Sequence, residues 1–202
     1  MSDDLQWQGI VDGTMQHQTP PWDLTVGFLL ESKNVTCLAT HEEGMARRTA
    51  RVSCVQEHSL PPWEMKQLKH RLKTAHNRQL IAGPTDPSNV HNAGVGAIAG
   101  TLDTLFEFVP VTLEFKKVRD SGRAIHIGYG MGKCGMVFSI FNLYGISGGA
   151  HDPKKAKSTS RILRACIQEA HHFPANPKLL VGDLNGDFDS FPELEMLCET
   201  MG

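Results

Sequence analysis

The chemistry of this sequence centres on the stretch from Leu179 to Asn185. Its apolar part, 179–181, is bounded by turn formers and is typical of a buried strand. Asp183 and Asn185 follow, so their side chains lie where a strand leaves the core, which is where α/β proteins place their chemistry. Gly182 can bring the backbone close to a ligand without steric cost. This stretch predicts half of a metal-dependent phosphodiesterase site.

Three other polar residues occur in the same context, at or just after the end of a predicted strand. They are Asn34, Glu57 and Tyr144. Carboxylate, carboxamide and phenol oxygens suit a hard cation and a phosphate, and they favour magnesium or manganese over zinc. A single carboxylate together with a substrate phosphate is how magnesium is usually held, because this ion keeps several of its waters. The expected cofactor is Mg²⁺, with Mn²⁺ as an alternative.

Each of these signals is weak on its own, and other interpretations stay open. A glutamate at a strand end is often a solvated residue or a helix cap, and Tyr144 can be a packed ring with a bonded hydroxyl. Asn34 also opens a glycosylation sequon, Asn-Val-Thr, although no secretory signal accompanies it. The residues from Asp183 onward partly mimic an EF-hand loop. That pattern fails because Phe188 stands where it needs glycine and Leu194 where it needs glutamate.

The glycines around Lys133 raise a second phosphate-binding alternative. A P-loop needs a glycine and a hydroxyl residue at positions that here hold Ile127 and Cys134. The flanking runs 123–129 and 136–143 instead predict a β-hairpin around this turn.

The elements that must position the candidate residues alternate between strands and helices, which indicates an α/β fold. Outside the hairpin, strands are expected at 24–30 (with 35–38 continuing or following it), 51–56, 94–99, 109–115 and 179–182. Helices are expected at 41–50, 65–75 and 154–172, and the first of them follows the capping pair Thr40 and Glu43. A last helix is expected from Ser190, with Glu193 as its capping partner, and it carries Leu194, Leu197 and Met201. The helix at 65–75 carries a polar face that we interpret as solvated surface rather than a nucleic-acid patch: Lys66, Lys69, Arg71 and Lys73.

Composition bounds the class of protein. With 202 residues, 40% of them hydrophobic and 21% charged, the chain fits one globular domain. A net charge of -2 gives no overall electrostatic footprint for nucleic acid. The five cysteines include no CxxC pair and indicate a reducing compartment. Residues 1–23 are expected to be a poorly ordered lead-in, and no run is long enough to span a membrane. We expect an intracellular protein, with nucleus and cytoplasm both open.

Five short segments occur along the chain in an order that is typical of a known group of proteins. They read Asn-Val-Thr-Cys-Leu, Val-Gln-Glu-His, Gly-Val-Gly-Ala-Ile-Ala, Phe-Asn-Leu-Tyr-Gly and Val-Gly-Asp-Leu-Asn. This order resembles the endonuclease/exonuclease/phosphatase superfamily, and is most similar to the endonuclease domains of non-LTR retrotransposons and to apurinic-type endonucleases. The resemblance covers roughly 34–188. It implies a two-sheet α/β sandwich with the site at one rim of the sheets, and hydrolysis of nucleic-acid phosphodiester bonds with DNA as the expected substrate.

The resemblance also implies a role for each candidate. Glu57 would ligate the catalytic Mg²⁺, with Asn34 beside it. Tyr144 would hydrogen-bond the scissile phosphate. Asp183 would orient and help deprotonate the attacking water, and Asn185 would support the phosphate and the neighbouring groups.

Three further residues take roles from the same resemblance. Asn142 is expected to bind substrate, whereas Gly94 and Gly96 match a glycine-rich strand with a structural role.

The C-terminal part departs from the superfamily pattern. Members carry a further Asp, and a catalytic His in a Ser-Asp-His element near the chain end. Here Asn185 is followed by only 17 residues, and His172 is the last histidine. We therefore expect a partial domain at 24–202, truncated in its second half, with weak or no activity. His58 and His151 are chemically able substitutes, although histidines without such a role are the commoner case.

Two functions consequently stay open. One is a magnesium-dependent nuclease, and the other is a non-catalytic phosphate- or nucleic-acid-binding remnant of the same fold. A missing half would leave a sheet edge and apolar faces uncovered, so we also expect an oligomer or completion by another chain. A zinc enzyme is disfavoured because the ten histidines show no metal-ligand spacing.

Overall fold

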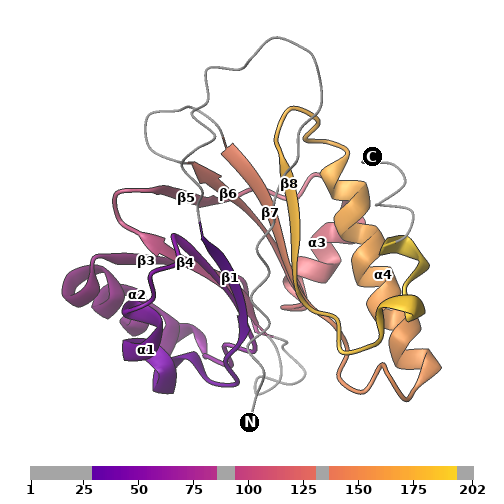
Figure 1. Cartoon of the computed structure of the whole chain (residues 1–202), viewed down its shortest axis with the longest axis horizontal. Helices are drawn as coiled ribbons and strands as arrows, with labels where there is room; N and C mark the ends of the chain where they lie inside the picture. Colours follow the sequence, from indigo (N-terminus) through magenta and orange to yellow (C-terminus); the bar gives the residue numbers. More distant parts are fainter. Residues whose placement is uncertain (1–28, 86–93, 131–136, 195–202) are drawn as a thin grey trace.

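The architecture is a sandwich of two four-stranded sheets with helices on their outer faces (Figure 1). The structure, a computed structural model, describes residues 29–85, 94–130 and 137–194. The expected two-sheet α/β sandwich is confirmed. Predictions that fall on 1–23, on the turn 131–136 and on the last residues, including Leu197 and Met201, lie outside the described residues.

The first sheet has the order β1-β2-β4-β3. Its strands are β1 (Leu30–Asn34), β2 (Val52–Gln56), β3 (Arg78–Ala82) and β4 (Val95–Gly100). β1 runs parallel to β2, and β4 runs antiparallel to both of its neighbours. The outer face is covered by the 3-10 helix η1 (Leu38–His41), α1 (Glu42–Ala46) and α2 (Pro62–His76). Helix α2 buries Met65, Leu68 and Leu72 against this sheet.

The second sheet has the order β5-β6-β7-β8. Its strands are β5 (Thr104–Glu107), β6 (Ala124–Gly130), β7 (Val137–Tyr144) and β8 (Lys178–Asp183), and it is accompanied by α3 (Leu113–Asp120), α4 (Pro153–Ala170) and the 3-10 helix η3 (Phe188–Ser190). β6 and β7 form the expected antiparallel hairpin, and β8 lies parallel to β7. Helix α4 begins at Pro153 after Asp152, whose carboxylate accepts a bond from the Lys154 amide. No helix in the described ranges is long and apolar enough to cross a membrane.

One predicted strand and one predicted helix cap are wrong, although the helix expected at 41–50 is present as α1. The alternating run 109–115 is not a strand: it leads into α3, because Thr112 caps that helix by accepting a bond from the Phe115 amide. Thr40 does not cap a helix either. It lies inside η1, and its hydroxyl donates to the Cys37 carbonyl. β1 extends beyond the predicted bound at residue 30 to Asn34, and 35–38 is not a strand, while the predicted residues 24–28 lie outside the described ranges.

One buried amide joins the two sheets. The Asn142 side chain on β7 is fully buried, and its Nδ2 donates to the carbonyls of Val55 and Gly96 at 2.9 and 2.8 Å. Its Oδ1 accepts a bond from Gln56 Nε2 at 2.6 Å. All three contacts cross from the second sheet to the first. Asn142 therefore fixes how the sheets are stacked, one layer below the strand ends.

We expect Asn142→Ala to lower the free energy of unfolding by about 3 kcal/mol, because it leaves two buried carbonyls and a buried amide without their partner. Urea denaturation measures this. Asn176→Ala removes the same group from the loop before β8, and should change stability by less than about 0.5 kcal/mol. Equal stability of the two variants would contradict the role of Asn142.

Two buried histidines are held neutral in the folded protein. The ring of His126 stacks between Phe108 and Phe141, at centroid distances of 4.3 and 4.0 Å, and burial lowers its pKa to about 3. Burial also lowers the pKa of His58 to about 4. His58 Nδ1 accepts a bond from the Leu60 amide at 3.2 Å, so Nε2 carries the proton and donates it to the Gly83 carbonyl.

Stability should therefore fall in mild acid. Because both pKa values lie below 6.5, the usual pKa of histidine, the unfolded chain binds more protons than the folded one below about pH 6.5. The stabilisation is complete above that pH and is lost toward pH 4, with a slope of up to about 1.4 kcal/mol per pH unit for each histidine. Denaturation at several pH values should show a smaller slope for His126→Phe. The exposed control His151→Gln should keep the wild-type slope, and an unchanged slope in His126→Phe would refute the assignment.

Candidate functional site

Two pairs of parallel strands end at the same edge of the sandwich. On the first sheet Asn34 pairs with Gln56, the last residue of β2, and Glu57 follows directly. On the second sheet Tyr144 and Asp183 are opposite each other at the ends of β7 and β8. The carboxyl ends of parallel strands meet at one edge. Sheet pairing alone therefore gathers the predicted residues in two groups.

Hydrogen bonds between the sheets then join the two groups. Asn34 Nδ2 donates to Asp183 Oδ2 at 3.3 Å, and the Tyr144 hydroxyl donates to Glu57 Oε1. The strands β1 and β8 lie next to each other where the sheets meet (Figure 1). Residues that are 87 to 149 positions apart in the chain thus share one edge.

The Asp183 carboxylate is held from two sides. Its Oδ2 faces Asn34, and its Oδ1 accepts a bond from the Asn185 amide at 2.9 Å. Asn185 adopts a φ of 54°, a left-handed conformation that Asn tolerates well, and its Nδ2 donates to the Gly145 carbonyl at 3.2 Å. Asp183 is consequently an oriented carboxylate with acceptor capacity to spare.

Gly182 is needed for a reason different from the one predicted. Its φ is 142°, and an added Cβ would lie 1.9 Å from the Leu143 carbonyl oxygen. The close approach is therefore to the neighbouring strand β7 and not to a ligand. The absence of a side chain lets β8 lie against β7 so that Asp183 comes level with Tyr144.

Tyr144 is a buried ring with its hydroxyl at the site. The hydroxyl lies between Glu57 and Ser147, whose Oγ is 2.9 Å away. Burial, followed by the hydrogen bond to Glu57, raises the pKa of Tyr144 above its usual value. The Arg123 guanidinium lies 5.1 Å from the ring centroid, and its Nη1 donates to the Gly145 carbonyl. The phenol therefore stays protonated and serves as a hydrogen-bond donor.

Backbone strain is concentrated at this edge. Among the described residues, five non-glycine residues have positive φ, and four of them are in or beside the segments that carry the site: Thr36 (47°), Glu57 (55°), Ser59 (51°) and Asn185 (54°). Thr36 is β-branched and rarely adopts such a φ, and its amide donates to Asn34 Oδ1 at 3.2 Å. Strained residues that persist in a fold are typical of functional sites, because the surrounding structure must hold them there.

Two candidates are placed elsewhere than their predicted roles require. All the polar atoms of Asn142 are used in bonds below the site, so its side chain is not available to a substrate. His58 is not on the surface: it is fully buried with both ring nitrogens bonded. Its ring also explains Gly94, where an added Cβ would lie 2.3 Å from a ring atom. At Gly96, inside β4, an added Cβ would lie 2.7 Å from the Ile81 carbonyl oxygen, so each of the two glycines has its own structural reason.

Sequence motifs did not indicate three groups at the edge. Ser147 bonds Tyr144, Arg123 lies against the same ring, and the Thr36 amide orients Asn34. All three act through contacts that only the folded chain creates. Short motifs therefore could not have identified them.

The donor set fits a hard divalent cation. Glu57 uses Oε1 for Tyr144, and its Oε2 has no hydrogen-bond partner among the described residues, while Asn34 and Asp183 add oxygens nearby. The described parts contain no cluster of three or more His, Cys, Asp and Glu side chains that could hold a metal by themselves. An ion that keeps most of its waters and takes one carboxylate matches this arrangement better than zinc does.

The fold is a two-sheet α/β sandwich with carboxylate and amide oxygens at one rim. It is the fold of the endonuclease/exonuclease/phosphatase superfamily. No protein-family model matches the chain, and no curated protein matches it.

The chain is similar in fold to several solved structures. A 3'-5' exonuclease, NExo, from Neisseria meningitidis superposes with a TM-score of 0.59 at 12% identity, over 84% of this chain and 70% of that one. An AP endonuclease from Archaeoglobus fulgidus gives 0.59 at 13% identity, over 86% and 71%. The endonuclease domain of TRAS1, a telomere-specific non-LTR retrotransposon, gives 0.55 at 11% identity, over 86% and 70%. At such identities the likeness establishes the fold, and function has to be argued from the site.

Proposed function

We propose that the protein is a magnesium-dependent phosphodiesterase that hydrolyses nucleic-acid phosphodiester bonds, with DNA as its substrate. The observation that carries this proposal is the pair of bonds between the sheets, Asn34 to Asp183 and Tyr144 to Glu57, which places two carboxylates at one rim. The named neighbours, an exonuclease and an AP endonuclease, support nucleic acid as the substrate class.

Glu57 and Asn34 are the residues that we assign to the metal ion. Glu57 offers a carboxylate oxygen free of protein donors in the described chain, and Asn34 Oδ1 can accept a further contact beside the Thr36 amide. A bound Mg²⁺ would supply the positive charge that offsets the negative charge developing on the phosphate.

The remaining residues handle water and phosphate. Asp183, oriented by Asn34 and by the Asn185 amide, accepts the proton of the attacking water. Tyr144 remains protonated, and it holds Glu57 in place or donates to a phosphate oxygen when Glu57 turns to the metal. Asn185, fixed on Gly145, supports the Asp183 side of the site.

Nicking of supercoiled plasmid DNA tests the proposal. The wild-type protein with Mg²⁺ should convert plasmid to the relaxed form, and Glu57→Ala and Asp183→Ala should each abolish this above background. No nicking by the wild-type protein, or nicking that persists in both variants, would refute it. DNA binding without any nicking would support instead the non-catalytic binding function.

A further inference from the structure

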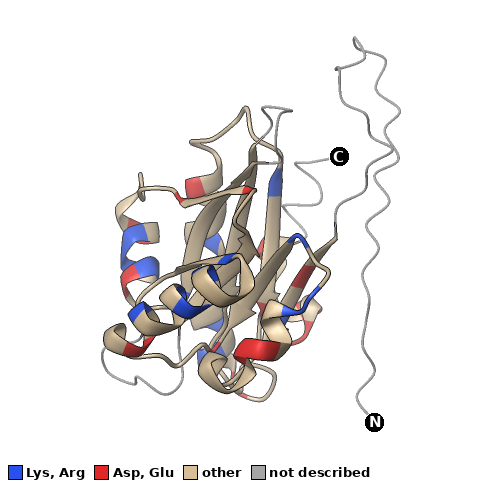
Figure 2. Cartoon of the chain, turned by 90° about the vertical axis from the view of Figure 1, so that its left-hand side faces the viewer, with Lys and Arg blue, Asp and Glu red and all other residues tan. Residues whose placement is uncertain are grey.

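Helix α2 presents a surface that the proposed catalytic site does not use. Its apolar stripe faces the first sheet, so the opposite side is exposed. Trp63 is 61% exposed in the first turn, an unusual state for so large an apolar ring. The side chains near it on this face, spaced by three or four residues, are polar or basic: Lys66, Gln67, His70, Arg71 and Lys73. We call these six residues the α2 face. Figure 2 shows the lysines and arginines of this side of the molecule.

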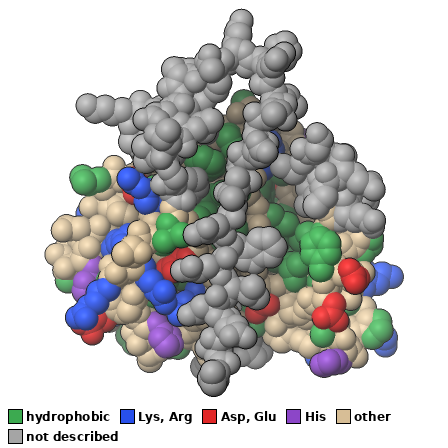
Figure 3. Space-filling view, in the orientation of Figure 1, with side chains coloured by type: hydrophobic (Ala, Val, Ile, Leu, Met, Phe, Trp, Pro, Cys, Tyr) green, Lys and Arg blue, Asp and Glu red, His purple; other side chains and the backbone are tan. Residues whose placement is uncertain are grey.

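The α2 face has a shape as well as a charge. Lys66, Gln67, His70 and Arg71 line a shallow, open hollow of about 400 Å³. In the space-filling view, basic and histidine side chains gather on the side of the molecule formed by α1 and α2 (Figure 3). The face therefore offers hydrogen-bond donors around a depression beside an exposed aromatic ring.

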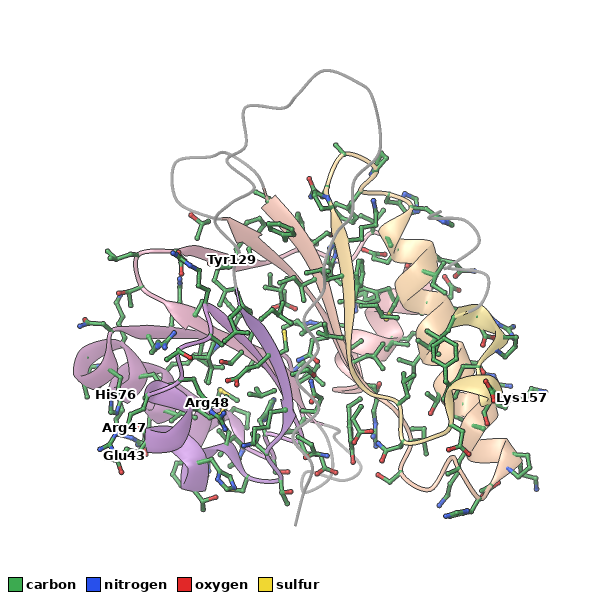
Figure 4. The ribbon with its side chains drawn as sticks, viewed as in Figure 1. Glu43, Arg47, Arg48, His76, Tyr129 and Lys157 are labelled. Atoms are coloured by element: carbon green, nitrogen blue, oxygen red, sulfur yellow. The ribbon has the colours of Figure 1, made fainter. Side chains whose placement is uncertain are left out.

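Nearby carboxylates neutralise Arg71 but, within the described residues, leave the lysines of this helix unpaired. Glu42 already accepts bonds from Arg71 at 2.9 Å and faces His76 at 3.9 Å. Glu43 on α1 pairs with Arg47, which directly follows that helix (Figure 4). By contrast, Lys66, Lys69 and Lys73 form no ion pair with any residue that the structure describes. The lysines are thus available for an anionic partner.

The unpaired lysines and the exposed Trp63 together indicate the chemistry of the partner. Unpaired lysines bind phosphates, and an exposed aromatic ring stacks on bases; together they are the features of a platform for single-stranded nucleic acid. A membrane surface fits poorly, because the apolar side of α2 is already buried in the protein. A duplex also fits less well, because its bases are stacked on each other and not free to meet Trp63.

The α2 face lies close to the proposed site along the chain. Trp63 follows Glu57 by six residues, so the two are at most about 20 Å apart. From Trp63 the helix carries the face about 15 Å further, to Lys73. We propose that the α2 face, whose basic residues the sequence alone favoured as solvated surface, binds a single-stranded segment of the nucleic acid that flanks the bond to be cleaved. This inference rests on the proposed function for the link to cleavage, but the binding itself is testable alone.

Binding of labelled poly-dT, measured by fluorescence anisotropy in EDTA at several KCl concentrations, tests the inference without cleavage. Trp63→Ala should weaken binding about tenfold, the loss of one stacked base. Lys66→Glu and Lys73→Glu should each weaken it severalfold and reduce the slope of log K against log salt by about 0.7 per lost phosphate contact. Lys157→Glu makes the same charge change on α4 and should behave as the wild-type protein does. All four side chains are exposed or partly exposed, and circular dichroism should confirm that the variants fold.

Two outcomes with poly-dT would overturn the inference: no binding by the wild-type protein, or binding by all three α2 variants that equals that of Lys157→Glu. Two outcomes with other ligands would also overturn it. These are tighter binding of duplex DNA than of poly-dT, or binding of poly-glutamate equal to that of poly-dT together with no effect of Trp63→Ala.

Failure of this inference can be distinguished from failure of the proposed function. Plasmid nicking with unaffected poly-dT binding in the α2 variants would refute the α2 face alone. Poly-dT binding that depends on the α2 face, without any nicking, would refute the catalytic proposal alone.

Discussion

Asp183→Asn is expected to slow Mg²⁺-dependent cleavage of DNA by about 10²- to 10⁴-fold, the range typical of a lost general base. The substitution keeps the size of the side chain. It also keeps an oxygen that can accept the bond from the Asn185 amide, now at 2.9 Å. What it removes is the negative charge, the ability to take a proton from water and the oxygen that accepts the bond from Asn34 Nδ2. Single-turnover cleavage of a labelled duplex oligonucleotide measures the effect.

Asp189→Asn provides the matched control. Asp189 is exposed in η3, six residues further along the chain, and it loses the same charge. The Asp189→Asn protein should cleave DNA at the wild-type rate within a factor of about two. If Asp183→Asn cleaved as fast as Asp189→Asn, Asp183 would not be the base, and water activation would have to be assigned to another group.

Gly182→Ala is expected to lower the free energy of unfolding by about 4 kcal/mol or more, enough to unfold a domain of ordinary stability. The new methyl group would lie 1.9 Å from the Leu143 carbonyl oxygen, and a φ of 142° is unfavourable for any residue with a Cβ. Rotation of a side chain relieves neither the clash nor the unfavourable φ, because the clashing oxygen belongs to the backbone of β7. Chemical denaturation or thermal unfolding measures the loss.

Gly44→Ala is the control for this substitution. Gly44 lies in α1, and an added Cβ there has nothing within 4 Å. Alanine should be neutral or should stabilise the helix by up to about 1 kcal/mol. A Gly182→Ala protein as stable as Gly44→Ala would show that β8 is not held against β7 as described.

The parts of the fold that sequence patterns revealed are those in which local and tertiary preferences agree. Helix α4 combines a proline at its first turn with one apolar stripe, and the β6–β7 hairpin combines two apolar runs with a glycine-rich turn. The strand ends at Glu57, Tyr144 and Asp183 could be predicted because an apolar run stops abruptly at a polar residue. In these places the pattern and the structure coincide.

Other parts depend on contacts that no local pattern contains. β3 and β5 are short edge strands whose form is set by their pairing with β4 and β6. The run 109–115 alternates like a strand, but the buried Glu169 on α4 accepts bonds from the amides of Val111 and Thr112 and so fixes the chain as the entry to α3. Asn142 shows the same limit at the site. The resemblance to the superfamily implied that Asn142 contacts substrate, whereas its side chain points to the other sheet.

The Mg²⁺ dependence of the single-turnover cleavage rate, compared between the wild-type protein and Glu57→Gln, tests the central claim most directly. Glutamine preserves an acceptor for the Tyr144 hydroxyl while removing the charge that we assign to the metal. The account predicts a wild-type rate that rises to saturation with Mg²⁺ and vanishes with EDTA, and a Glu57→Gln rate at least about 10²-fold lower at the same Mg²⁺ concentration. Cleavage that is unaffected by EDTA, or identical Mg²⁺ dependence in the two proteins, would contradict it.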